Sequence, residues 1–419
     1  MSKKMKTTQS FHSTNKFWAI KFFILLILTF LITTSCDLTD PKKDKPKPEG
    51  YQEDIPWPSL ADSPWPMNHH DPQNTGRSNS FGPVFGKIDW MKDSLFHYNR
   101  GIAIDSDSTI YIASSQYLYA YRINGILKWK TFISNGESGS TPLVTKDFIF
   151  VHYIYGGLYA INKKGEIAWR NSVIKEISEL SITKDGSILF VDADGNLSSY
   201  DKNGTHLWSF SNSIIKPKSF ISISPDSKTL YLNGRLKAVL AFNIDEKRIV
   251  WDFGNSNLFG GPLIDSDGSI YLSSKSEKFN NNNPAVFCLS PDGNVKWFFP
   301  HEQWAFQENY NNHGFITMDK NGSIYFGSDT LFSINFNGKL RWKKALQISQ
   351  ATALVCDKEN RIYACRETNS YNFELLILND AGEIVKSLLL EGETTFSSPA
   401  LGYGRLFQPT YQDFVYLVK

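Results

Sequence analysis

The sequence is poor in cysteine and in long apolar runs. Its 419 residues include four cysteines, none adjacent to another and none with the spacing of a metal site. The longest apolar run, Phe22 to Ile32, is shorter than the roughly 20 residues of a membrane-spanning helix. These absences argue against a cysteine-based metal centre and against a transmembrane anchor. Cys288, Cys356 and Cys365 are expected to be small buried side chains, with a Cys356–Cys365 disulfide as the alternative.

A strong excess of either charge is also missing. The formal net charge of +2 depends on five lysines among residues 1–35, a stretch without a single acidic residue. The remainder of the chain is close to neutral and slightly acidic. A protein of this kind has no electrostatic footprint for nucleic acid or for an anionic membrane surface, so neither is expected as a partner.

The N-terminus has the pattern of an export signal. A basic stretch precedes the apolar run, and small polar residues lead to Cys36. Thr33 to Cys36 resembles a bacterial lipobox, which implies a signal peptide over residues 1–35 and acylation of Cys36. An ordinary cleaved signal is the alternative. Residues 36–56, rich in Lys, Pro, Asp and Glu, are expected to form a disordered tether. The protein is therefore expected to be exported and lipid-anchored to an envelope membrane, with the outer membrane favoured and its side left open.

A repeat with a period of about 40 residues dominates the rest of the chain. In each unit a glycine is followed four residues later by a tryptophan. The pairs are Gly86/Trp90, Gly125/Trp129, Gly165/Trp169, Gly204/Trp208, Gly293/Trp297 and Gly338/Trp342. Trp251 fits the same frame with Lys247 in the glycine position, and Gly382 fits it with Lys386 in the tryptophan position. The chain thus contains eight units.

Each unit is predicted to be a four-stranded antiparallel meander. Asp-Gly or Asn-Gly between alternating β-branched and aromatic residues, as in Ile264 to Ser274 and Met318 to Ser328, is a strong hairpin signal. A third strand, the turn at the repeat glycine and a fourth strand containing the tryptophan follow. Such meanders bury their two faces by packing around an axis, which predicts an all-β, eight-bladed β-propeller over residues 83–419.

The two ends of the repeat region indicate how the ring closes. The last unit supplies three strands from about Thr395 onward, while Gly86 to Trp90 stands alone without an upstream hairpin. The N-terminal strand should therefore complete the C-terminal blade and remove the last exposed sheet edges. The tryptophans Trp90, Trp129, Trp169, Trp208, Trp251, Trp297 and Trp342 are expected to fill the space between blades.

The repeats resemble the quinoprotein-like propeller repeat. The segment preceding them also resembles the usual lead-in of such propellers, with Trp65, Pro66, Asp71, Thr75 and Gly76 in matching places. Residues 57–82 are accordingly expected to be a lead-in that packs on the propeller. The histidines His69 and His70 belong to it, which favours a structural role over a catalytic one.

The resemblance also implies an alternative function. Quinoprotein dehydrogenases of this fold hold pyrroloquinoline quinone (PQQ) and Ca²⁺ above the axis, often beside a disulfide between adjacent cysteines, which this chain lacks. The loops that begin at Asp265 and Asp319 match only the first half of an EF-hand, and turn chemistry explains their residues. No cofactor or metal is therefore predicted; PQQ with calcium remains the alternative, and the protein is not expected to be an enzyme.

The repeat is interrupted at one place. From Trp297 to the next inner hairpin the chain needs 22 residues, against 14 to 16 in regular units, and the extra residues lie in Pro300 to Gly314. A second long loop, Lys275 to Pro284, should emerge on the same face. The candidate binding residues of this loop are His301, Glu302, Trp304, Phe306, Tyr310 and His313. A loop that folds over and caps the channel is the competing interpretation.

These observations favour a non-catalytic envelope lipoprotein that acts as a monomeric protein-binding scaffold. Its partner would be another envelope or outer-membrane protein, held by the loop face of the propeller, and only the lipid anchor would contact the membrane. A quinone-dependent dehydrogenase and a carbohydrate-binding surface lipoprotein are the alternatives.

Overall fold

The computed structural model divides the chain into two units, Met1–Pro48 and Glu49–Lys419, and the fold below is that of the second. The described residues are 46–92, 101–172, 174, 176–255, 261–281, 283–301, 316–327, 329–349, 353–369, 372–393, 398–410 and 415–419. The predicted signal peptide, Cys36 and residues 37–45 of the tether therefore lie outside them. No helix within the described part of the chain is long and apolar enough to cross a membrane.

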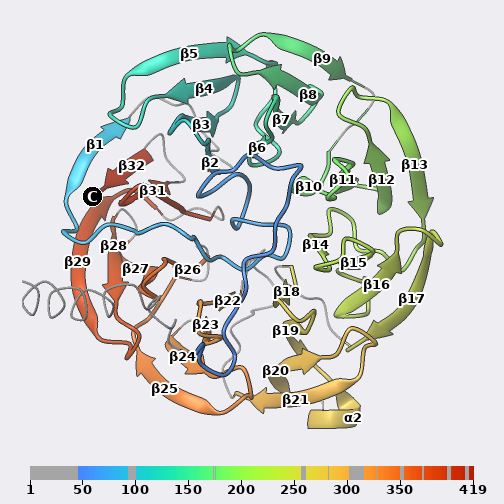
Figure 1. The fold of residues 1–419 in the computed structure, drawn as a ribbon, viewed down its shortest axis with the longest axis vertical. Coiled ribbons are helices and arrows are strands. Elements are labelled where there is room, and N and C mark those ends of the chain that lie inside the picture. Colours follow the sequence, from blue (N-terminus) through green and yellow to red (C-terminus); the bar gives the residue numbers. More distant parts are fainter. Residues whose placement is uncertain are drawn as a thin grey trace, which may run out of the picture. The chain divides into compact units, whose positions relative to one another are not determined.

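The strands of the described residues form eight four-stranded antiparallel sheets arranged around one axis (Figure 1). Seven blades are continuous in sequence. Blade 1 contains β2 (Ile102–Ile104), β3 (Ile110–Ala113), β4 (Tyr117–Tyr121) and β5 (Leu127–Phe132). Blade 2 contains β6 (Leu143–Val144), β7 (Phe148–Tyr153), β8 (Gly157–Asn162) and β9 (Ile167–Asn171). Blade 3 contains β10 (Ser181–Ile182), β11 (Ile188–Val191), β12 (Asn196–Tyr200) and β13 (His206–Ser211). Blade 4 contains β14 (Ile221–Ile223), β15 (Thr229–Leu232), β16 (Val239–Asn243) and β17 (Arg248–Phe253).

The remaining blades follow the same order from the axis outward. Blade 5 contains β18 (Leu263–Ile264), β19 (Ile270–Lys275), β20 (Pro284–Leu289) and β21 (Val295–Pro300), with the short helix α2 (Glu277–Asn280) between its second and third strands. Blade 6 contains β22 (Thr317–Met318), β23 (Ile324–Gly327), β24 (Thr330–Ile334) and β25 (Leu340–Ala345). Blade 7 contains β26 (Val355–Cys356), β27 (Ile362–Asn369), β28 (Asn372–Leu378) and β29 (Ile384–Glu391).

Blade 8 closes the ring with strands from both ends of the unit. β30 (Ala400–Gly402), β31 (Arg405–Pro409) and β32 (Val415–Val418) supply its three inner strands, and β1 (Ile88–Lys92) is its outermost strand. β1 pairs antiparallel with β32, with Trp90 opposite Leu417. The predicted eight-bladed propeller, with an N-terminal strand completing the C-terminal blade, is confirmed.

Seven of the eight blades contact the next through the repeat tryptophan. The indole of Trp129 in blade 1 lies against the turn glycine of blade 2, Gly165, where an added Cβ would come within 2.7 Å of the ring. Trp129 Nε1 also donates a hydrogen bond to the carbonyl of Lys163 at 3.2 Å. The same two contacts recur for Trp90, Trp169, Trp251, Trp297 and Trp342.

Two irregular repeats keep this contact by other means. Lys247 occupies the glycine position beside Trp208, and its ammonium lies 4.3 Å from the centroid of the indole ring, a cation–π distance. Lys386 occupies the tryptophan position of blade 7, and its side-chain carbons pack against Gly86. The blade-to-blade contact is therefore retained at both irregular repeats.

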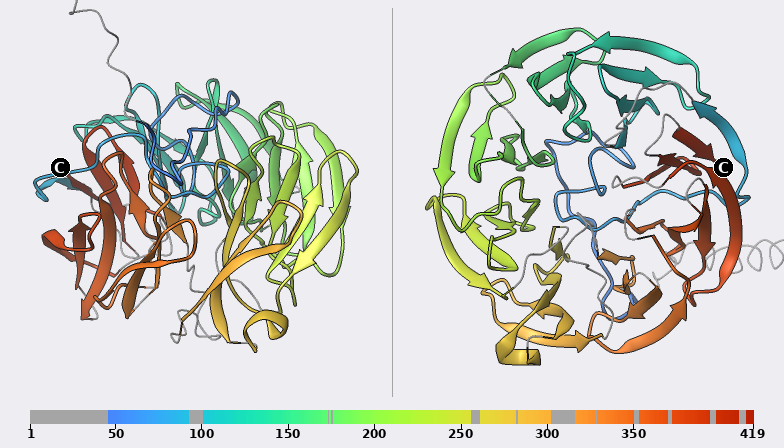
Figure 2. Two further views of the ribbon diagram at one scale, coloured as in Figure 1. Left: turned by 60° about the horizontal axis from the view of Figure 1, so that its bottom comes forward. Right: turned by 180° about the vertical axis from the view of Figure 1, so that it is seen from behind.

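The propeller has two different ends. We call the end that carries the turns between first and second strands, such as Asp105–Thr109, and between third and fourth strands, such as Arg122–Ile126, the hairpin face. The opposite end, the loop face, carries the turns between second and third strands, such as Tyr153–Gly157, and the blade-to-blade connections. α2 lies on the loop face, and the N-terminal segment of the unit lies on the hairpin face (Figure 2).

Candidate functional site

Residues 57–82, the lead-in segment, cross the axis at the hairpin face (Figure 1). Backbone carbonyls of this segment accept hydrogen bonds from N–H groups of six innermost strands. The donor and acceptor pairs are Ile104/Trp65, Val144/Pro66, Ile223/Pro72, Ile264/Gln73, Met318/Thr75 and Cys356/Gly76, at 2.7 to 3.2 Å. The other two blades are reached by side chains, because Trp57 Nε1 donates to the carbonyl of Ile182 at 2.8 Å and Ser78 Oγ donates to that of Leu401 at 3.1 Å. The segment therefore contacts the innermost strand of all eight blades.

A compact turn around Asp71 shapes the middle of the lead-in segment. Asp71 Oδ1 accepts hydrogen bonds from the backbone N–H groups of Gln73 and Thr75, both at 3.1 Å. Its Oδ2 accepts from the Thr75 hydroxyl and from His70 Nδ1, the latter at 2.8 Å. Hydrogen bonds from His70 and Thr75 lower the pKa of Asp71 against the opposing effect of its burial, which is the largest single influence. The carboxylate thus organises the carbonyls that pair with the inner strands.

The two adjacent histidines have different environments. His69 is fully buried, its Nδ1 lies 2.8 Å from the carbonyl of Asn74, and burial lowers the pKa of its imidazole to about 4. His70 is partly exposed and is held by Asp71. Both residues have positive φ, 53° and 79°, which is uncommon outside glycine. His69 is a neutral core group, whereas His70 can present its ring to a ligand.

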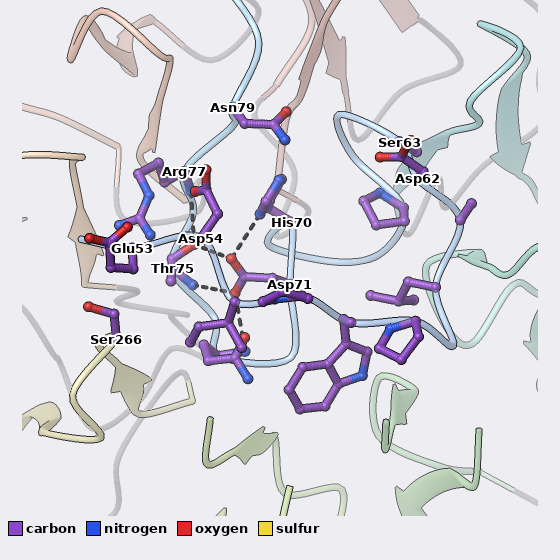
Figure 3. Close-up of a pocket in the computed structure, with 18 of the residues that line it drawn as sticks. Glu53, Asp54, Asp62, Ser63, His70, Asp71, Thr75, Arg77, Asn79 and Ser266 are labelled. Atoms are coloured by element: carbon purple, nitrogen blue, oxygen red, sulfur yellow. Dashed lines mark hydrogen bonds and ion pairs between the residues drawn. The ribbon is translucent and has the colours of Figure 1, made fainter. Parts of the chain in front are cut away.

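A cavity of about 750 Å³ lies against the lead-in segment (Figure 3). Trp57, Leu60 and Ile264 provide part of its apolar wall, and His70 and Arg77 provide part of its polar wall. This volume is within the usual range for small-molecule sites, roughly 300–1,000 Å³. The mixed wall suits a ligand that has both an apolar face and polar groups.

Arg77 is the most unusual residue of this cavity. Its side chain is buried, at 7% exposure, and Nη1 donates two long hydrogen bonds of 3.3 Å to the carbonyls of Met318 and Asp319. Among the residues that the structure describes, no carboxylate forms an ion pair with it. Buried arginines are usually paired, so the remaining guanidinium donors are available to an acceptor in the cavity. Sequence reasoning missed this residue, although an arginine inside a segment of turn-forming residues is a signal.

Part of the predicted tether is held against the propeller. Residues up to 56 were expected to be a disordered tether, yet Gln52 is buried at 4% exposure. Its backbone N–H donates to the carbonyl of Lys320, and its side-chain oxygen accepts from the Ser266 N–H at 3.0 Å. Composition misled here, because a polar residue that satisfies backbone groups of the propeller is buried by hydrogen bonds rather than by apolar packing.

Most of the predicted binding loop lies outside the described residues. This applies to Glu302, Trp304, Phe306, Tyr310 and His313. His301 is described and differs from the expected polar rim, because it is 6% exposed and its ring packs 5.6 Å from Phe326 and 6.4 Å from Phe332. His301 is thus part of the packing between blades 5 and 6 rather than of an open surface.

Other residues of the loop face expose large side chains. Tyr155, in the turn of blade 2, is 93% exposed, and Leu236, in the corresponding turn of blade 4, is 80% exposed. Ile214 lies beside Leu236, because the Arg235 N–H donates to the Ile214 carbonyl at 2.8 Å. The sequence held a weak signal for them: an aromatic or aliphatic side chain occupies a tight turn where Gly, Asn or Asp is usual.

The aspartates of the inner hairpins serve the turns. Asp265 Oδ1 accepts from the backbone N–H groups of Asp267 and Ser269, and its Oδ2 accepts from the Tyr271 hydroxyl at 2.7 Å. Asp319 is bonded in the same way by Asn321, Ser323 and Tyr325. In the described part of the chain, no group of three or more His, Cys, Asp or Glu side chains could hold a metal ion. Cys288, Cys356 and Cys365 are buried free thiols.

Comparison with known proteins places the fold among quinoprotein-like propellers. Residues 114–283 match the family described as outer membrane protein assembly factor BamB. The structure of BamB from Moraxella catarrhalis superposes with a TM-score of 0.57, at 14% identity, over 80% of this chain and 98% of that one. The family match covers 170 of the 419 residues, and the propeller is similar in fold to BamB. No curated protein matches the chain in sequence.

The propeller is also similar in fold to other solved structures. The quinohemoprotein alcohol dehydrogenase from Comamonas testosteroni superposes with a TM-score of 0.60, at 11% identity, over 84% of this chain and 80% of that one. The propeller of Dos1 gives 0.57 at 12% identity, over 80% and 95% of the two chains. At identities this low the superpositions show a shared fold only, and the function has to be inferred from the site.

Proposed function

We propose that this protein is a non-catalytic lipoprotein of a bacterial envelope that holds another envelope protein on its loop face. The observation that carries the proposal is the exposure of Tyr155 and Leu236 there. The hairpin-face end of the axis is occupied by the chain's own lead-in segment, so the two ends of the propeller are not equivalent. The description of the matching family as an assembly factor of outer-membrane proteins favours a partner from that membrane.

The chemistry of the loop face fits a protein partner. Tyrosine and arginine are enriched among the residues that contribute most to binding at protein interfaces. The same face also exposes Arg235 and Leu236. A large apolar or amphipathic side chain that no neighbour covers gains most from burial against a partner. The partner would therefore present an apolar pocket with an acidic rim.

The proposal is tested by chemical crosslinking in the native envelope, followed by purification of the tagged protein. The variant carries Tyr155→Glu and Leu236→Glu, and the matched control carries Leu340→Glu, since Leu340 is 48% exposed on the outer strand β25. One outer-membrane or envelope protein should be recovered with wild type and control and be lost with the double variant. Equal recovery with all three proteins, or none with any, would contradict the proposal.

The cavity at the hairpin face favours a second function, the binding of a short saccharide. Arg77 can donate to sugar hydroxyls, His70 can donate to or accept from them, and Trp57 can pack against a sugar face. Calorimetric titration with a set of di- and trisaccharides should give binding that Arg77→Met abolishes and Arg235→Met leaves unchanged. Absence of heat for every sugar would remove this candidate.

A further inference from the structure

Residues 79–88, the strap, leave the axis on the hairpin face, cross blades 7 and 8 and lead into β1 (Figure 2). Hydrogen bonds fix the backbone of the strap. The Gly82 N–H donates to Asp357 Oδ2 at 3.0 Å, the Tyr363 hydroxyl donates to the carbonyl of Pro83 at 3.2 Å, and the Gly404 N–H donates to the carbonyl of Phe81 at 2.9 Å. The strap is therefore a well-held part of the surface.

The fixed strap nevertheless exposes a series of large apolar side chains. Phe81 is 48% exposed, Val84 59%, Phe85 70% and Ile88 44%. The neighbouring strand β29 adds Ile384 at 43% and Val385 at 54%; the two segments meet where Lys386 packs on Gly86. Single exposed apolar residues are ordinary, but a cluster of this size on one side of a monomer usually marks an interaction surface.

Lysines surround the cluster without neutralisation by acids. Lys87, Lys358 and Lys386 are exposed and have no ion-pair partner among the described residues. The ammonium of Lys358 lies over the ring of Phe81, 5.2 Å from its centroid.

Most acidic side chains nearby are paired with cations, and Glu383, next to Ile384, accepts a hydrogen bond from Asn379 Nδ2 at 2.8 Å. Asp357 and Glu359 form ion pairs with Arg361, and Asp89 pairs with Lys419 and Arg405. The cluster is therefore locally basic, although the chain as a whole is close to neutral.

We propose that the strap docks the propeller on the anionic lipid surface to which the acyl chains of Cys36 attach it. Exposed phenylalanine and aliphatic side chains combined with unpaired lysines bind the interface of a bilayer containing anionic lipid, because apolar burial and charge attraction add. The sequence predicted contact with the membrane through the lipid anchor only, because the basic surface is local and the net charge hides it.

The entry of the chain on the hairpin face supports this orientation. Gly50 packs against Phe336, and Gln52 binds Lys320 and Ser266, so the unit begins at the same end of the propeller as the strap. Cys36 precedes Glu49 by 13 residues, which can span at most about 45 Å. A lipid attached at Cys36 would therefore keep the hairpin face near the membrane and turn the loop face toward a partner. This inference rests on the proposed function, which supplies the acyl anchor at Cys36.

The test uses the mature chain from residue 36 onward with Cys36→Ser, which has no acyl chains. Flotation with phosphatidylethanolamine vesicles containing about 30% phosphatidylglycerol is compared with flotation on pure phosphatidylcholine vesicles. The protein should float with the anionic vesicles and remain behind with the neutral ones. Phe85→Ser should lower the bound fraction about tenfold, and Lys87→Glu with Lys386→Glu should abolish the preference for anionic lipid. Leu236→Ser, an exposed apolar residue of the loop face, is the matched control and should bind like the parent.

Binding to neither vesicle, or equal binding by Phe85→Ser and Leu236→Ser, would overturn the proposal. A strap that binds a protein instead of lipid would give the first of these results. The anchor is tested separately, by incorporation of labelled palmitate into the protein in cells, which Cys36→Ser should abolish. Because the vesicle experiment lacks the acyl chains, its outcome and that of the anchor test are independent.

Discussion

At the residue scale, the tryptophan of each repeat connects two blades. Trp129 packs on Gly165, donates to the Lys163 carbonyl and lies 5.8 Å from the ring of Tyr111. We expect Trp129→Ala to lower the free energy of unfolding by about 3 to 5 kcal/mol, as truncation of a large packed aromatic side chain does. Urea unfolding at equilibrium measures this, with Leu340→Ala on an exposed outer strand as the control. A loss below about 1 kcal/mol for Trp129→Ala would show that the indole does not carry this contact.

The Gly-Trp spacing was readable from sequence because it combines a positive-φ turn with a large side chain at a fixed distance in each unit. The replacements at Lys247 and Lys386 were recognised only by their place in the frame. Their compensating contacts, with Trp208 and with Gly86, join different blades and have no local signature.

Asp265 gives the propeller a pH dependence that sequence could not reveal. Burial, followed by its contact with Asp267, raises the pKa of its carboxyl from 3.8 to about 7. The native state therefore binds more protons than the unfolded state between about pH 4 and pH 7, and the free energy of unfolding contributed by this group falls as pH rises through that range.

Asp265→Asn should remove this dependence, because the amide is neutral at every pH and can still accept the turn N–H bonds. The urea midpoint of Asp265→Asn minus that of wild type should be larger at pH 8 than at pH 5. Asp357→Asn is a contrasting variant, since it breaks the ion pair with Arg361 and should destabilise at both pH values. A wild-type midpoint that rises from pH 5 to pH 8, and rises equally in Asp265→Asn, would contradict the assignment.

At the scale of elements, the sequence predicts that a lead-in segment exists but does not predict its course across the propeller. The matching positions from Trp65 to Gly76 indicated a segment that packs on the propeller. Its hydrogen bonds join strands that are far apart in sequence, and it has neither a helical nor an alternating apolar pattern. Its course across the innermost strands therefore required the structure.

Asp71 tests whether this segment holds the centre of the propeller together. We expect Asp71→Ala to release the turn, since it removes the acceptor of two backbone N–H groups, the Thr75 hydroxyl and His70. The free energy of unfolding should fall by about 2 to 4 kcal/mol. Hydrogen exchange should become faster at the amides of Ile223 and Ile264, which donate to this segment. Asp194→Ala, in an outer turn of blade 3, should leave those amides protected. Unchanged hydrogen exchange at these amides in Asp71→Ala would contradict the idea that the Asp71 turn stabilises the inner strands.

At the scale of the whole molecule, the count of repeats predicted the eight-bladed ring and its closure. It did not predict which function belongs to which of the two faces. The predicted loop from Pro300 to Gly314 largely remains a prediction, and His301 at its start is buried. The exposed residues of the loop face, Tyr155 and Leu236, belong to ordinary-length turns and so did not interrupt the repeat. Irregular repeat spacing reveals inserted residues. It does not reveal an unusual residue type, such as Tyr155 or Leu236, in a turn of regular length.

The central claim, that the loop face holds an envelope protein, is tested most directly by a photo-activated crosslinking side chain placed at single positions of the protein in its native envelope. Positions 155 and 236 sample the loop face, and positions 126 and 340, both exposed, sample the hairpin end and the outer surface. The proposal predicts adducts with one and the same protein from positions 155 and 236, and none from 126 or 340. Adducts of equal yield at all four positions, or none at 155 and 236, would contradict it.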